Sequence, residues 1–237
     1  MKMDEKLEKE REERRKLFLS WDIENDLPCE VGDYVLKRID FPTMEDRKTG
    51  KVKTDIRVYT AFAWENEKNG WMVKAIFDEE TKDYMVKMDL RLMTLTQLES
   101  ITGDFGQFKK RVRELTPKAI EKELIHLERV SVLAAAKGFM KWDYEKVMPE
   151  IIKPVNPVEG LNGSFIIGAY ECRERNIGVL FFYNIYREEY YGELRAGGIP
   201  VIVHQYDATT INEFSSHLEA YLEKDLEMLY ENPVVED

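Results

Sequence analysis

The sequence predicts an α+β protein in which antiparallel strands form meanders and helices pack on one face of the resulting sheet or sheets. Three observations support this class. Strand-like segments follow one another with polar links of only a few residues. Each run of such segments is followed by a segment with helical periodicity. Apolar residues make up 43% of the 237 residues, which is typical of a globular core that needs no disulfides.

The N-terminal segment, residues 2–19, is predicted to be a charged helix. It contains no Gly or Pro, and it places Glu5 four residues before Lys9, the favourable order for an ion pair on a helix. Apolar residues are scarce before Leu17, so we expect the helix to be anchored only at its C-terminal end. Residues 1–20 are therefore either a solvated arm or an arm that binds a partner or promotes oligomerisation.

Residues 28–148 are predicted to form a first half, a meander followed by helices. Its strands are expected at Tyr34–Ile39, Ile56–Trp64, Gly70–Phe77 and Tyr84–Leu92. The links ENEKN and DEETKD between the last three segments are short and polar, as hairpin loops require. Met85, Lys87 and Asp89 alternate with Tyr84, Val86, Met88 and Leu90, which predicts a half-buried sheet.

Helical segments follow these strands. Thr94 and Gln97 have the spacing of a capping box, which predicts a short helix over Leu95–Ile101. The turn TGDFG interrupts it, and residues 108–115 continue in helical form. Thr116–Pro117 then predicts the start of a long helix, with Thr as the N-cap and Pro at the first helical position.

A segment rich in Pro and Gly, residues 149–163, is the best linker candidate in the chain. Residues 160–237 are predicted to form a second half of the same plan. Its strands are expected at Ser164–Cys172, Gly178–Ile185, Glu189–Arg195 and Pro200–Tyr206, and its helix at Ile211–Tyr230. The sequence leaves open whether the chain has two similar halves or a single domain.

Composition restricts the cellular location and the kinds of partner that we expect. The formal net charge of −11 disfavours nucleic acid as a partner. No apolar run is long enough to cross a bilayer, and the first 16 residues are too charged for a secretory signal. The two cysteines, Cys29 and Cys172, have no metal-ligand spacing. We therefore expect a cytoplasmic protein with reduced thiols, no membrane contact and no cofactor.

The stretch VIVHQYDATTINEFSSH contains two of the three histidines. His204, Asp207 and His217 are candidate zinc ligands, which would make the protein a small metal-dependent hydrolase. Their spacing matches no recognised motif, and a structural interpretation competes with this one. Thr210 and Glu213 have capping-box spacing, and Asp207 suits the turn before the last helix. Strand alternation would place Ile202, His204 and Tyr206 on one face and Val201, Val203 and Gln205 on the other.

Glycines beside a basic helix start suggest a second alternative. Gly103, Gly106, Lys109 and Arg111 could bind an anion or a nucleotide through backbone amides and positive charge. The segment lacks the phosphate-loop pattern, so an ordinary turn is the competing interpretation.

The segment Gly178–Arg195 is dense in aromatic residues. Both faces of its predicted hairpin carry rings, so the hairpin is either covered on both sides or offers a contact surface. The anchor candidates are Phe182, Tyr183, Tyr186, Tyr190 and Tyr191. We therefore favour a cytosolic protein-interaction or regulatory module over an enzyme, with a protein partner or self-association through this aromatic sheet face.

Overall fold

The structure, a computed structural model, describes residues 2–41, 58–125, 158–159, 163–197 and 199–231. Contacts within the chain divide them into two compact units. The first unit contains the described residues up to 90 together with 96–118, and the second contains 91–95 and the described residues from 119 onward.

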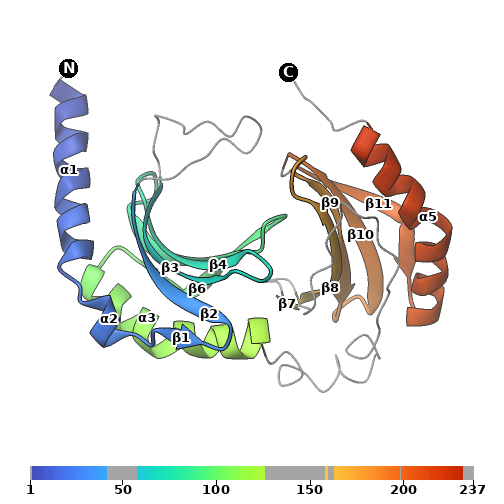
Figure 1. The fold of residues 1–237 in the computed structure, drawn as a ribbon, viewed down its shortest axis with the longest axis horizontal. Coiled ribbons are helices and arrows are strands. Elements are labelled where there is room, and N and C mark those ends of the chain that lie inside the picture. Colours follow the sequence, from blue (N-terminus) through green and yellow to red (C-terminus); the bar gives the residue numbers. More distant parts are fainter. Residues whose placement is uncertain (1, 42–57, 126–157, 160–162, 198, 232–237) are drawn as a thin grey trace. The chain divides into compact units, whose positions relative to one another are not determined.

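The first unit is built on an antiparallel sheet whose six described strands follow one another in chain order (Figure 1). The strands are β1 (Glu30–Val31), β2 (Tyr34–Phe41), β3 (Val58–Asn66), β4 (Trp71–Asp78), β5 (Asp83–Asp89) and β6 (Thr94–Thr102). The registers pair Ala63 of β3 with Lys74 of β4, and Lys74 with Lys87 of β5. β2 to β5 therefore occupy the four segments that the sequence predicts as strands.

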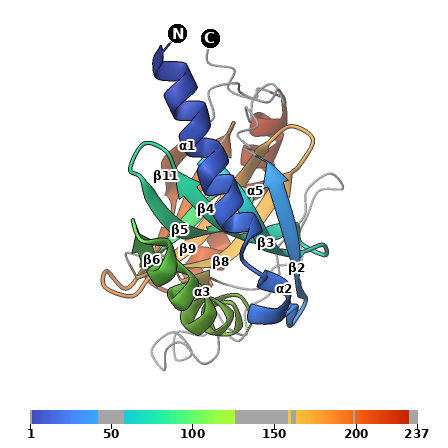
Figure 2. The same ribbon diagram turned by 90° about the vertical axis from the view of Figure 1, so that its left-hand side faces the viewer.

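Three helices pack on one face of this sheet, and Figure 2 shows α1 running across the strands. The helices are α1 (Lys2–Leu19), α2 (Ile23–Asp26) and α3 (Phe105–Ala119). Phe18 of α1 is buried, and its ring centroid lies 5.5 Å from that of Tyr59 and 5.6 Å from that of Tyr84. The guanidinium carbon of Arg14 lies 4.1 Å from the ring centroid of Phe77. α1 is thus anchored to the sheet at its C-terminal end, as predicted. The contacts extend from Phe18 toward the N-terminus as far as Arg14, more than one helical turn away.

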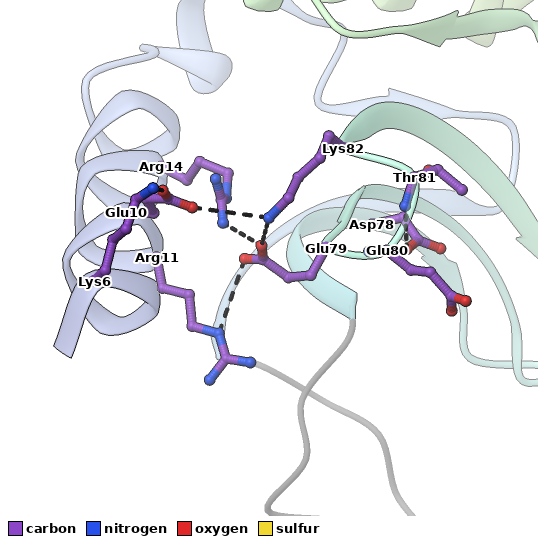
Figure 3. A network of polar contacts seen from close by, with 9 residues as sticks. All are labelled: Lys6, Glu10, Arg11, Arg14, Asp78, Glu79, Glu80, Thr81 and Lys82. Carbon is purple, nitrogen blue, oxygen red and sulfur yellow. Dashed lines mark hydrogen bonds and ion pairs between the residues drawn. The ribbon is translucent and has the colours of Figure 1, made fainter. Parts of the chain in front are cut away.

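A second contact holds α1 at the turn between β4 and β5 (Figure 3). Glu79 in this turn accepts a hydrogen bond from Arg14, and its carboxylate lies 3.1 Å from Nζ of Lys82 and 3.9 Å from Nε of Arg11. Lys82 also lies 3.8 Å from Glu10. Burial alone would raise the pKa of Glu79, but the hydrogen bonds and charges of Arg14 and Lys82 outweigh burial and hold the pKa below its ordinary value.

The predicted helix over Leu95–Ile101 is wrong, because these residues belong to strand β6. Threonine and isoleucine at several positions favour an extended chain, and the capping-box spacing of Thr94 and Gln97 has no helix to cap. Buried Ser100 connects β6 to β5: its hydroxyl accepts the amide of Val86 at 2.8 Å and donates to the carbonyl of Gln97 at 2.6 Å.

α3 begins earlier than predicted, because the turn TGDFG caps the helix instead of interrupting one. A side-chain oxygen of Asp104 accepts the amide of Gln107 at 2.7 Å, and the Asp104 carbonyl accepts the amide of Phe108 at 2.9 Å. Asp104 is therefore the N-cap of α3.

Thr116 and Pro117 lie inside α3, so the predicted helix start at this dipeptide is wrong. Thr116 is fully buried and donates from its hydroxyl to Oε1 of Gln97 at 3.1 Å. Pro117 has no amide proton to donate, and a π-helical segment, η1 (Ile120–Ile125), follows directly after α3. The rest of the predicted long helix, including His126, and the linker as far as residue 157 lie outside the described residues.

Among the described residues, the second unit contains a five-stranded antiparallel sheet, the π-helical segment η1 and one α-helix. The strands are β7 (Val158–Glu159), β8 (Ser164–Cys172), β9 (Ile177–Asn184), β10 (Glu189–Ala196) and β11 (Ile199–Ala208), and the helix is α5 (Ile211–Glu231). β7 and β11 form the two edges. β8 to β11 and α5 match the predicted segments to within two residues at each end.

α5 covers one face of the second sheet. Its buried apolar side chains are Phe214, Leu218, Leu222, Leu226 and Leu229. The ring of Phe214 stacks on Tyr190 with 5.3 Å between centroids and meets the edge of Phe181 at 5.4 Å. The predicted cap of α5 is confirmed, since the hydroxyl of Thr210 accepts the amide of Glu213 at 3.2 Å. The Glu213 carboxylate reaches back to the amide of Thr209 at 2.9 Å, which lowers the pKa of Glu213.

The C-terminal end of α5 is held by an arginine from the turn between β8 and β9. Arg175 donates a hydrogen bond to the carbonyl of Tyr230, and its guanidinium carbon lies 3.8 Å from the centroid of the Tyr230 ring. The positive charge also suits the negative end of the helix dipole.

Replacing Arg175 with alanine is expected to lower the free energy of unfolding by about 1 kcal/mol and to fray the last turn of α5. Hydrogen exchange in residues 226–231 measures this directly. Arg175→Lys keeps the charge but loses the planar stacking, so we expect an intermediate exchange rate. Exchange equal to wild type in the alanine variant would contradict the assignment.

The predicted α+β class, with antiparallel meanders and helices packed on them, is confirmed. No helix in the described part of the chain is both long and apolar enough to span a membrane.

Candidate functional site

Among the described strands of the second sheet, β11 lies at an edge, and it is long and apolar for an edge strand. It spans ten residues, and Ile199 is 43% exposed, Val201 52% and Ile202 61%. Proteins normally protect an edge with charged side chains, because its unpaired backbone groups can accept a further strand. β11 therefore presents both backbone hydrogen-bonding groups and apolar contact surface.

The first part of β11 is regular. Its register pairs Pro200 with Arg195 and Ile202 with Glu193 of β10. Proline is tolerated in an edge strand where its missing N–H would face solvent. With Pro200 in that orientation, the N–H and C=O of Ile202 also point outward, because the direction of these groups alternates along a strand.

A bulge follows in the second part of β11. The register passes from Val203 opposite Gly192 to Ala208 opposite Tyr190, so β11 contains extra residues relative to β10. As a result, Val203 and Tyr206 both pack against the core beneath α5. The predicted alternation, which places these two residues on opposite faces, is wrong across the bulge.

The bulge brings two neighbouring side chains to one buried carboxylate. Asp225 of α5 accepts hydrogen bonds from the hydroxyl of Tyr206 and from Nε2 of Gln205, the latter at 2.8 Å. Gly192 makes room for the Tyr206 ring, since a Cβ there would lie 2.7 Å from Cδ2 of the ring. This cluster fastens β11 to α5 on the side that faces the core.

One flank of α5 extends the apolar surface of β11. The ring centroid of Tyr221 lies 6.4 Å from that of Tyr206, so this flank faces β11. Met228 follows Tyr221 by two helical turns and lies on the same flank, and both side chains are exposed. The acidic residues Glu219, Glu223 and Glu227, spaced four apart, follow the opposite flank. Ile199 and Val201 share the α5 face of β11 with Val203, whereas Ile202 projects from the opposite face. We call Ile199, Val201 and Ile202, together with Tyr221 and Met228, the edge patch.

The first eight residues of β11, beneath the edge patch, carry no formal charge, and Asp207 follows them in the bulge. Residues 199–206 read IPVIVHQY and contain no Asp, Glu, Lys or Arg, although 34% of the whole chain consists of these residues. Because charge at a sheet edge discourages pairing with another chain, its absence here favours such pairing.

Two of the three predicted metal ligands, His204 and Asp207, come together, but His217 does not join them in a group of three. Nδ1 of His204 lies 2.8 Å from Oδ2 of Asp207, and both side chains are largely exposed. His217 lies on α5, with its ring centroid 6.3 Å from that of Tyr221. Among the described residues, no three His, Cys, Asp or Glu side chains are placed to hold one ion. His204, Asp207 and His217 therefore do not form a three-residue metal-binding group in the described part of the chain.

The charged side chains at the predicted anion site contact other residues of the first unit. Gly103 and Gly106 flank Asp104, whose carboxylate caps α3 and places negative charge where an anion would bind. Lys109 lies with Nζ 5.5 Å from the centroid of the Phe105 ring, and Arg111 donates to the carbonyl of Ile101 at 2.5 Å. Lys109 and Arg111, the two basic residues of this candidate site, thus make contacts within the first unit.

Four of the five predicted aromatic anchors are buried, which corrects the prediction that they form a docking face. Tyr183 and Tyr190 lie in the core beneath α5. Phe182 and Tyr191 stack on each other, with 5.0 Å between centroids, and are buried as well. Tyr186, at the turn between β9 and β10, is 77% exposed.

The position of β11 at the edge of the sheet could have been predicted from the order of the strands, although not from its side chains alone. A strand that ends a meander has a neighbour on one side only, so the segment Pro200–Tyr206 could have been assigned to an edge. The run IPVIV then stands out because it lacks a protecting charge.

Comparison of the chain with protein-family models, with curated proteins and with solved structures finds no match.

Proposed function

We propose that this chain is a protein-interaction module that binds a partner chain by adding a strand to the edge of β11. In this mode the backbone hydrogen bonds of the added strand supply affinity, and the side chains that flank the edge supply specificity. The observation that carries the proposal is the edge segment 199–206, which contains no Asp, Glu, Lys or Arg and exposes Ile199, Val201 and Ile202.

The proposal keeps the interaction role that the sequence suggests but changes its location. The aromatic rings of β9 and β10 build the sheet, and the edge of the same sheet becomes the docking surface. Asp225 supports this role, because its hydrogen bonds with Gln205 and Tyr206 hold β11 in place when its outer side is unpaired. As part of the proposal we place the module in the cytoplasm, where an exposed thiol such as Cys29 stays reduced.

Site-specific photo-crosslinking in the expressing cell tests this function. A benzophenone side chain placed at Ile202 is expected to crosslink to another protein chain, because this side chain lies on the docking edge. The matched control is Leu98 on β6, an exposed apolar residue of the first unit. Val201→Lys should reduce crosslinking from position 202, since a charge on the edge opposes pairing. Equal crosslinking from both positions, or no effect of Val201→Lys, would contradict the proposal.

A further inference from the structure

We infer that the partner at β11 is a second copy of this chain, joined by antiparallel pairing of the two β11 strands across a two-fold axis. The inference rests on the proposed function and names its partner. Two-fold dimers are the commonest closed assemblies, and each copy supplies the same surface.

The distribution of charge is the first argument for a second copy. Two chains with a net charge of −11 repel each other at a distance, so they can associate only where the contact itself is neutral. Residues 199–206 provide such a contact. The acidic row that contains Glu223 follows the flank of α5 away from β11, while Tyr221 and Met228 lie on the near flank. A basic partner would instead be matched by carboxylates along the edge, and residues 199–206 contain none.

The sequence of the strand is the second argument, because it is self-complementary in antiparallel pairing. With Ile202 opposite its own copy, Val201 lies opposite Val203 and Pro200 opposite His204. None of these pairs contains an Asp, Glu, Lys or Arg side chain, so no pair places two such charges of like sign together. The outward N–H and C=O of the two Ile202 residues exchange both hydrogen bonds at the centre.

This pairing would also cover the surface that each copy leaves exposed. The two sheets become one continuous sheet through the axis, which removes the free edge at β11. Both helices α5 lie on the same face of that sheet, with the Met228 flank of each turned toward the axis. Tyr221, Met228 and Val201 of the edge patch are thus covered on the α5 face of the seam, and Ile202 packs against its own copy on the opposite face.

Sedimentation equilibrium of the purified full chain tests the inference. Wild type is expected to show a reversible equilibrium between monomer and dimer. Increasing NaCl from about 0.05 M to about 0.5 M should strengthen the dimer, because salt screens the repulsion between two acidic chains and leaves the neutral seam intact. A basic partner segment would show the opposite salt dependence.

Charge variants at the axis test the register. Ile202→Lys and Ile202→Glu should each weaken the dimer at least ~100-fold, because each places two like charges face to face. Ile202 is exposed in one copy, so both variants should fold, as circular dichroism would show. An equimolar mixture should associate again to within ~10-fold of wild type, since lysine then faces glutamate. Leu98→Lys, at the exposed control position, should dimerise like wild type.

Three outcomes would overturn the inference: a wild type that stays monomeric at about 0.5 mM, a dimer that persists in Ile202→Lys, or a mixture that fails to associate. The proposed function is tested separately from the identity of the partner. If position 202 crosslinks to a different protein while the purified chain is monomeric, the docking edge is real and the second copy is not its partner.

Discussion

Replacing Asp225 with alanine is expected to lower the free energy of unfolding of the second unit by about 2–3 kcal/mol. The hydroxyl of Tyr206 is fully buried, and Asp225 accepts its hydrogen bond. Without the carboxylate, that buried hydroxyl loses this acceptor, and removing one partner of a buried hydrogen bond costs more than the bond contributes when formed. Urea denaturation measures the loss, and hydrogen exchange in α5 and β11 assigns it to the second unit.

The matched control is a double variant in which both partners become apolar. Tyr206→Phe removes the hydroxyl, and Asp225→Leu removes the carboxylate at similar volume. Together they should be less destabilising than the sum of the single changes, because neither leaves the other unsatisfied. If the effects of the two single changes on unfolding free energy simply add in the double variant, the hydrogen bond is not the reason why Asp225 stabilises the unit.

The same variant connects stability with the proposed function. Asp225 holds the bulged half of β11, so Asp225→Ala should increase hydrogen exchange in β11 before the unit unfolds. A loosened edge strand is a poorer template for pairing. We therefore expect weaker self-association than in wild type, although Asp225 lies away from the proposed seam.

Sequence reasoning located the strands well because their signals are local. The meander of β8 to β11 follows from short apolar segments separated by polar turns, and the start of α5 follows from Thr210 and Glu213.

Sequence reasoning failed where a tertiary contact overrides a local pattern. β6 has capping-box spacing at Thr94 but pairs as a strand, because buried Ser100 bonds the backbone of β5. Thr116 resembles an N-cap but is buried inside α3 against Gln97.

The candidate site was harder to predict for two physical reasons. Alternation cannot anticipate the bulge that turns Gln205 and Tyr206 toward the same carboxylate, because a bulge depends on how two strands pair. The aromatic run Phe181–Tyr183 does not reveal which rings α5 will cover. In contrast, the exposure of Ile202 follows from topology, since the last strand of a meander is paired on one side.

Glu79→Gln is expected to lower the free energy of unfolding of the first unit by about 2–4 kcal/mol. The carboxylate is almost fully buried, with Arg14 and Arg11 on α1 and Lys82 on its own turn as partners. Arg14 is largely buried, so removing the carboxylate takes the acceptor away from a buried positive charge, which costs more than a surface ion pair contributes. The control is Glu80→Gln, because Glu80 is an exposed neighbour on the same turn that points away from α1 (Figure 3). Equal effects of the two variants would contradict the role of Glu79.

The dependence of this effect on pH distinguishes a charged contact from simple packing. The pKa of Glu79 lies below its ordinary value in the folded chain, because the hydrogen bonds and charges of Arg14 and Lys82 outweigh the effect of burial. A carboxyl group with a depressed folded pKa contributes its full stabilisation above the unfolded pKa, and this contribution is lost as the pH falls through the folded pKa. The difference in unfolding free energy between wild type and Glu79→Gln should therefore be constant near neutrality and narrow in acid, below the ordinary value of 4.5. Denaturation curves of the two proteins from pH 7 to pH 3 measure the difference. If the difference in unfolding free energy stays the same across that range, Glu79 holds α1 through packing and not through its charge.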